Sequence, residues 1–78
     1  MLIYDEVNNQ NYAIESNDIT YILKRPTLYN GKTWNIYFCL RGKTGTEWYY
    51  EDKEIRNKVF DSILKVLDAK SVNILTLE

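Results

Sequence analysis

The residues best able to do chemistry in this 78-residue chain are its clustered acids. Asp5 and Glu6 are adjacent, and Glu51, Asp52 and Glu54 lie close together in the sequence. The chain has no histidine, so a general base would have to be a carboxylate or a lysine with a shifted pKa. Adjacent acids in a turn or at a helix start are normally solvated or used as caps. We therefore expect no catalytic residue and no enzymatic activity.

The single thiol and one glycine-rich segment also favour structural roles. Cys39 has no histidine to form a Cys–His nucleophile within the chain, and we expect a small, half-buried hydrophobic residue. One cysteine can form no internal disulfide and cannot complete a four-ligand zinc site, so we expect no metal and no cofactor. The segment 42–46 superficially resembles a phosphate-binding loop, but such a loop is longer and opens a helix. Between two predicted strands, it indicates a hairpin turn.

Short strands followed by one helix must position these residues. Alternating and β-branched segments predict strands over about 2–5, 12–14, 18–25, 33–41 and 46–51. Asp52 fits a helix N-cap, and apolar residues at steps of three and four predict an amphipathic helix over about 53–69. Residues 72–77 are apolar enough for a further strand or an extended tail. The sequence thus predicts a single α+β domain over 1–78, an antiparallel meander of four to five strands with a C-terminal helix on one face.

The phase of the strand over 33–41 decides which residues are available for binding. Its even positions are all large and apolar, which predicts that they form the core beneath the helix: Trp34, Ile36, Phe38 and Leu40. Because side chains alternate along a strand, Tyr37 and Cys39 should face outward. On the neighbouring strands we expect Tyr49, Thr20 and Ile22 on the same outward side, with Ile19, Tyr21 and Leu23 on the opposite one.

This outward set is more aromatic than a sheet face bathed in water normally is. Tyrosine buries a large area with few rotatable bonds and keeps a polar end, which makes it an interface residue. Three interpretations remain open: the N-terminal segment or the tail covers the face and completes the core, a protein binds there, or the face is a platform for a ligand or nucleic acid. The predicted interaction face is Tyr37, Cys39, Tyr49, Ile22 and Thr20, and the expected partner is a protein, including a second copy of the chain in a homodimer or larger homo-oligomer.

The alternative to protein binding as the function is single-stranded nucleic-acid or nucleotide binding. Bases could stack on tyrosines while cations at the sheet ends hold phosphates, and the candidate contacts are Tyr29, Lys32, Arg41 and Lys43. Lysine and arginine beside turns also keep strand edges soluble without binding anything. The net charge is −1 and the basic residues are scattered, which does not favour a nucleic-acid partner.

Composition limits the remaining classes. No apolar run approaches the ~20 residues that cross a bilayer, and the first residues lack the basic region and long apolar run of a signal peptide. We expect no membrane partner and a reducing cytoplasmic compartment. A chain of this size has a thin core, and without disulfides or a metal it depends on aromatic packing or oligomerisation.

The segments Leu2-Ile3-Tyr4, Asp18–Ile22, Trp34–Leu40 and Tyr49–Ile55 carry a resemblance. In pattern the chain resembles short uncharacterised proteins of Gram-positive bacteria and their phages, in which a few strands precede one C-terminal helix. A meander closed by a helix is also similar to pleckstrin-homology-like domains, which have more strands. The resemblance implies the α+β arrangement and no catalytic residues.

Overall fold

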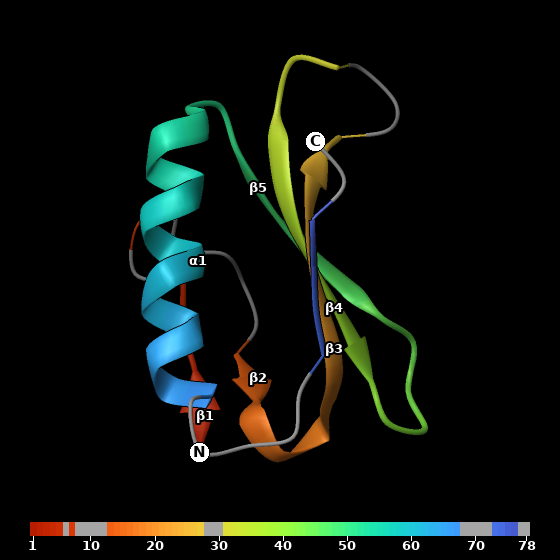
Figure 1. Cartoon of the computed structure of the whole chain (residues 1–78). Helices are drawn as coiled ribbons and strands as arrows, with labels where there is room; N and C mark the ends of the chain where they lie inside the picture. The colour runs from red at the N-terminus through yellow and green to blue at the C-terminus, as the bar shows by residue number, and fades with distance from the viewer. Residues whose placement is uncertain (6, 8–12, 28–30, 68–72, 77–78) are drawn as a thin grey trace.

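The computed structural model describes residues 1–5, 7, 13–27, 31–67 and 73–76. A small antiparallel ribbon is formed by β1 (Leu2–Ile3) and β2 (Ile14–Glu15). A four-stranded sheet follows, and α1 (Lys53–Leu67) packs against it. In Figure 1, α1 and the β1–β2 ribbon lie on the same side of the larger sheet. The α+β prediction is confirmed, with six strands in two sheets among the described residues.

Three of the four strands form the predicted meander. These are β3 (Ile19–Pro26), β4 (Trp34–Leu40) and β5 (Thr46–Tyr50), joined as antiparallel neighbours. The turn glycines Gly31 and Gly42 have φ angles of 63° and 65°, a conformation that side chains with a Cβ rarely adopt. The tail forms β6 (Asn73–Thr76), which pairs in parallel with β3 and completes the order β5-β4-β3-β6.

The core fills the space between the sheet, the ribbon and α1. Phe38 and Trp48 are its largest aromatic pair, with ring centroids 4.8 Å apart in an edge-on arrangement. Each large apolar side chain buried here contributes about 1.5–3 kcal/mol. All three layers supply core residues: Ile3, Ile14, Ile19, Ile22, Ile36, Phe38, Trp48, Tyr50, Phe60, Ile63 and Leu67.

A β-bulge in β3 overturns part of the predicted outward face. Ile19 pairs with Leu40 and Tyr21 pairs with Cys39, so Thr20 is an extra residue in the ladder. The Thr20 hydroxyl donates a hydrogen bond to the Cys39 carbonyl at 3.1 Å.

Beyond the bulge the alternation shifts by one residue. Ile22 pairs with Phe38 and is fully buried in the core, at 0% exposure. The prediction that Ile22 faces outward is therefore wrong, because the bulge moves the phase and places Tyr21 and Leu23 opposite Cys39 and Tyr37 instead.

The helix begins where the sequence predicts, but not all of its apolar residues are buried. The Asp52 carboxylate accepts hydrogen bonds from the backbone N–H groups of Glu54 (2.8 Å) and Ile55 (3.2 Å), which confirms the N-cap. The buried positions are Arg56, Phe60, Ile63 and Leu67, whereas Ile55 and Val66 are exposed. No helix in the described part of the chain is both long and apolar enough to cross a membrane.

Candidate interaction face

The side of the four-stranded sheet that faces away from α1 is the candidate site. Alternation from the buried positions places on this side an outward sheet face that we define by its residues: Tyr21, Leu23 and Arg25 of β3, Asn35, Tyr37 and Cys39 of β4, Glu47 and Tyr49 of β5, and Leu75 of β6, which pairs with Leu23. No described helix or strand covers it (Figure 1). The N-terminal ribbon lies on the helix side and the tail extends the sheet edge, so neither described segment closes the face.

The two charges of this face neutralise each other. Arg25 Nη2 lies 2.6 Å from Glu47 Oε1, and Arg25 Nε donates to Asn35 Oδ1 at 3.2 Å. The guanidinium also stacks 4.9 Å from the centre of the Tyr37 ring, and the Tyr49 hydroxyl donates to the second oxygen of Glu47. The result is a polar network with no net charge that includes or contacts the Tyr37 and Tyr49 rings.

The aromatic rings form a connected group. Tyr21 and Tyr37 have ring centroids 6.3 Å apart, tilted by 43°, a separation within the range of favourable ring pairs. The neighbouring Cys39 side chain raises the pKa of Tyr21, first through a hydrogen bond and next through the negative charge of its ionised form. Tyr37 lies over Gly45 in the β4–β5 turn, where a Cβ atom would overlap the phenol ring.

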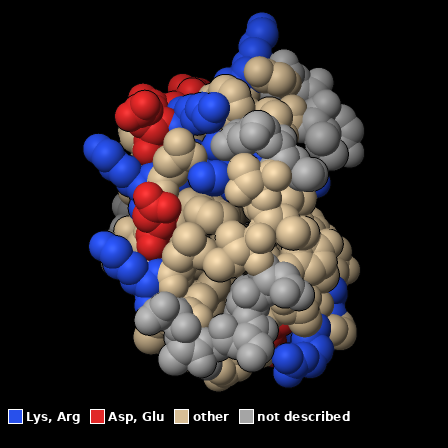
Figure 2. Space-filling view, viewed as in Figure 1, with Lys and Arg blue, Asp and Glu red and all other residues tan. Residues whose placement is uncertain are grey.

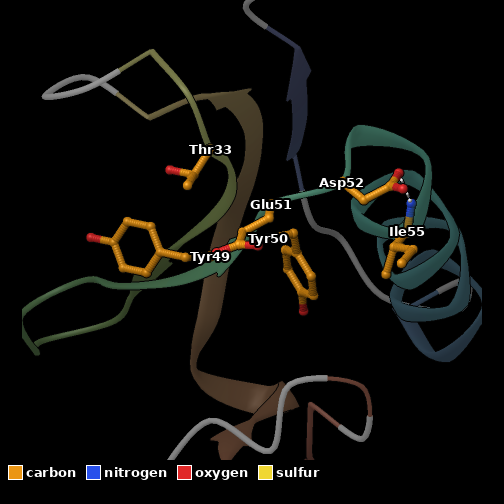
Figure 3. Close-up of a pocket in the computed structure, with 6 residues that line it drawn as sticks. All are labelled: Thr33, Tyr49, Tyr50, Glu51, Asp52 and Ile55. Atoms are coloured by element: carbon orange, nitrogen blue, oxygen red, sulfur yellow. Dashed lines mark hydrogen bonds between the residues drawn. The ribbon is translucent and has the colours of Figure 1, made fainter.

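Exposure distinguishes the members of the face. Tyr49 on the edge strand is 43% exposed, and Tyr21, Tyr37 and Cys39 are half-buried. In Figure 3, Tyr49 points away from α1 while its neighbour Tyr50 points to the other side of β5. The predicted outward residues Tyr37, Cys39 and Tyr49 therefore do share this face, and Tyr49 is its most accessible ring.

A hollow of about 510 Å3 lies at the junction of β5 and α1 (Figure 3). Its lining includes Glu51 and Asp52, two of the acids considered for catalysis, and the hydroxyl-bearing Thr33. The Asp52 carboxylate is engaged in capping the helix, and Glu51 is exposed. These two carboxylates do not form an acid–base pair, since that of Asp52 accepts hydrogen bonds from backbone N–H groups of α1.

The other acids considered for catalysis lie elsewhere. Asp5 is buried and accepts a hydrogen bond from the Val7 N–H at 3.1 Å. Burial, and next the adjacent Asp5 carboxylate, raise the pKa of Tyr50. Glu6 lies outside the described residues. Within the described ranges, no three Cys, Asp or Glu side chains are grouped to hold a metal ion.

The residues of the nucleic-acid interpretation do not gather in one place. Lys32 precedes β4 and Arg41 follows it, so they lie beyond opposite ends of a seven-residue strand that is about 23 Å long at roughly 3.3 Å per residue. Lys43 binds Asp18 at 2.7 Å, and that hydrogen bond raises the pKa of Lys43. Tyr29 lies outside the described residues. Figure 2 shows lysines and arginines dispersed around the rim of this view, with acids among them.

Sequence reasoning missed Arg56. It is fully buried, and one of its terminal nitrogens, Nη1, donates to two backbone carbonyls, Arg25 O and Asn35 O, each at 3.1 Å. Its guanidinium also lies 5.6 Å from the centre of the Trp34 ring. The available signal was helical spacing, since Arg56 precedes Phe60 by four residues and Ile63 by seven, the steps of one buried face.

Comparison with known proteins adds no family: no protein-family model, curated protein or solved structure matches this chain.

Proposed function

We propose that this protein is a non-enzymatic interaction module that associates with a second copy of itself through the outward sheet face. The observation that supports the proposal is that three tyrosines, Tyr21, Tyr37 and Tyr49, lie beside the Arg25–Glu47 ion pair, whose two charges neutralise each other. When two such faces pack together, their tyrosines come into contact and no unpaired charge is buried. Burying an unpaired charge is costly and normally opposes the covering of a charged surface.

A face of this kind suits an isologous contact, in which the same patch is used on both copies. Four strands spaced by about 4.8 Å and about 20 Å long give a footprint near 400 Å2. A standard interface buries about 800 Å2 on each partner. The expected association is therefore weak, with a dissociation constant in the micromolar range or above. Other proteins whose surface accommodates tyrosine side chains can compete for the same face.

The experiment is sedimentation equilibrium over roughly 10 μM to 1 mM protein, compared with the 9.3-kDa monomer mass. We expect the mean mass to rise with concentration in the wild type and to stay at the monomer value in Tyr49→Lys, because the lysine places an uncompensated charge in the interface. Tyr4→Lys is the matched control, since Tyr4 is also exposed but belongs to the β1 side of the molecule.

The single cysteine gives a second readout on the same face. A short bismaleimide should link Cys39 of two copies in the wild type and in Tyr4→Lys, and the linked product should fall in Tyr49→Lys. A wild-type protein that remains a monomer up to 1 mM and yields no linked product would refute the proposal.

A further inference from the structure

A second surface, remote from the outward sheet face, is an apolar groove between the N-terminal segment and α1. It has a volume of about 320 Å3, and its walls are Leu2, Tyr4 and Val7 on one side and Val59, Ser62 and Val66 on the other. Leu2, Tyr4, Val7 and Val66 are all exposed, with Tyr4 at 63%. Large apolar side chains gathered at one exposed place mark an interaction site more often than single ones do.

The helix wall has the geometry of a helix-binding groove. Val59, Ser62 and Val66 are spaced by three and four residues, so they form one straight stripe along α1. This stripe is about 10 Å long at 1.5 Å per residue, which matches two turns of an occupant. The Ser62 hydroxyl donates to the Lys58 carbonyl at 3.0 Å, so it adds no unpaired donor to the groove wall.

Charge at the outer rim of the groove indicates the chemistry of the occupant. Lys58 and Lys65, seven residues apart, flank the stripe on the solvent side, and both are exposed. Neither makes an ion pair within the part of the chain that the structure describes. Their acidic neighbours on α1 are Glu54 and Asp61, each four residues before a lysine. Figure 2 shows this alternation of charge along the flank of α1.

We infer that this groove binds a short amphipathic helix of a partner protein, with apolar residues at i, i+3 or i+4 and i+7 and with acidic residues along the flank that meets Lys58 and Lys65. The same charges disfavour the other occupants. Two copies of α1 packed antiparallel would bring Lys58 of one copy towards Lys65 of the other, which is repulsive. An anionic membrane is broader than a helix seated in the groove. It would therefore also reach Glu54 and Asp61, which lie further from the stripe around α1 than Lys58 and Lys65 do, and it would approach a chain of net charge −1.

The test uses a designed, helix-stabilised peptide of about 14 residues with leucines at the anchor positions and glutamates on one flank, labelled for fluorescence anisotropy. A peptide with the same anchors and lysines on the flank is its partner probe. We expect the acidic peptide to bind wild-type protein and the lysine peptide to bind about three- to tenfold more weakly, since two exposed ion pairs contribute modestly. The double variant K58E/K65E should reverse this preference.

Variants of the groove and of the other face complete the experiment. Val66→Glu should abolish binding of the acidic peptide, and circular dichroism should confirm that it folds. Tyr49→Lys, on the outward sheet face, should bind the peptide as the wild type does, which separates this groove from the proposed self-association.

Four results would overturn the inference. One is absence of acidic-peptide binding up to about 1 mM. Another is a preference that K58E/K65E leaves unchanged. The third is a rise of mean mass with concentration that is lost in Val66→Glu but kept in Tyr49→Lys, which would assign the groove to a second copy. The fourth is binding to vesicles of equal phosphatidylcholine and phosphatidylglycerol without peptide binding, which would assign the groove to a membrane.

Discussion

Replacing the buried Arg56 with methionine should destabilise the fold well beyond the effect of a surface substitution. Arg56 Nη1 serves the carbonyls of Arg25 and Asn35, which belong to two adjacent strands, so one side chain ties α1 to both β3 and β4. Methionine has a similar length but donates no hydrogen bond. The substitution therefore leaves two acceptors without this donor in a site that is closed to water.

The magnitude follows from these two contacts. Hydrogen bonds from a charged donor contribute about 1.5–3 kcal/mol each, and an unsatisfied buried acceptor costs about 1–3 kcal/mol. Removing the desolvation penalty of the guanidinium offsets part of the loss, which leaves an expected net loss of about 2–4 kcal/mol. A domain of this size has a total stability of roughly 4–12 kcal/mol, so the loss is a large fraction of it.

Urea denaturation followed by tryptophan fluorescence measures this loss directly. With a slope near 1 kcal/mol per molar urea for a small domain, the midpoint should fall by about 2 M or more in Arg56→Met. Arg56→Lys should lie between it and the wild type, because a lysine keeps the charge but not the planar fork of donors. Lys58→Met, an exposed position on the same helix, should change the midpoint little. A loss below about 0.5 kcal/mol in Arg56→Met would show that the two carbonyls do not need this donor.

Two further perturbations test other contacts. Gly45→Ala should lower the free energy of unfolding by about 1–3 kcal/mol in the same urea assay, because its methyl group overlaps the Tyr37 side chain. Thr44→Ala, in the same turn, should lower it little. Equal effects of the two substitutions would contradict the packing of Tyr37 on Gly45. Alkaline pH should destabilise the wild type more than Tyr50→Phe. The folded state raises the pKa of Tyr50, so its stabilising contribution is complete below the unfolded value of about 10 and falls by up to about 1.4 kcal/mol per pH unit above it. The two proteins share all their other tyrosines. If their free energies of unfolding fell in parallel between pH 9 and 11, Tyr50 would not be the source of the pH dependence.

Periodicity was sufficient to predict the main elements. The strand over 33–41 has four large apolar residues at alternate positions, and the core of β4 follows that phase, with Ile36 and Phe38 completely buried. Asp52 was identifiable as a cap because a carboxylate at a helix start serves the free amides of the first turn. Both signals depend only on neighbours along the chain.

The features that were missed depend on contacts between distant segments. The bulge at Thr20 adds one residue to a strand that otherwise alternates regularly, and no local signal distinguishes it from a regular ladder, so Ile22 was assigned to the wrong face. The pairing of Arg25 with Glu47 requires knowledge of which strands are neighbours. Arg56 was overlooked because a charged residue is rarely fully buried, although its spacing placed it with Phe60 and Leu67.

The order of strands in the sheet affects how the chain acquires its structure during synthesis. β3 is paired on one side by β4, which follows it directly, and on the other by β6, which follows α1. Until residues 73–76 have been made, one side of β3 has no neighbour and offers its backbone groups to any extended chain nearby. The meander and helix can assemble early from short-range contacts, but a nascent or truncated chain without β6 should be the form most prone to aggregate.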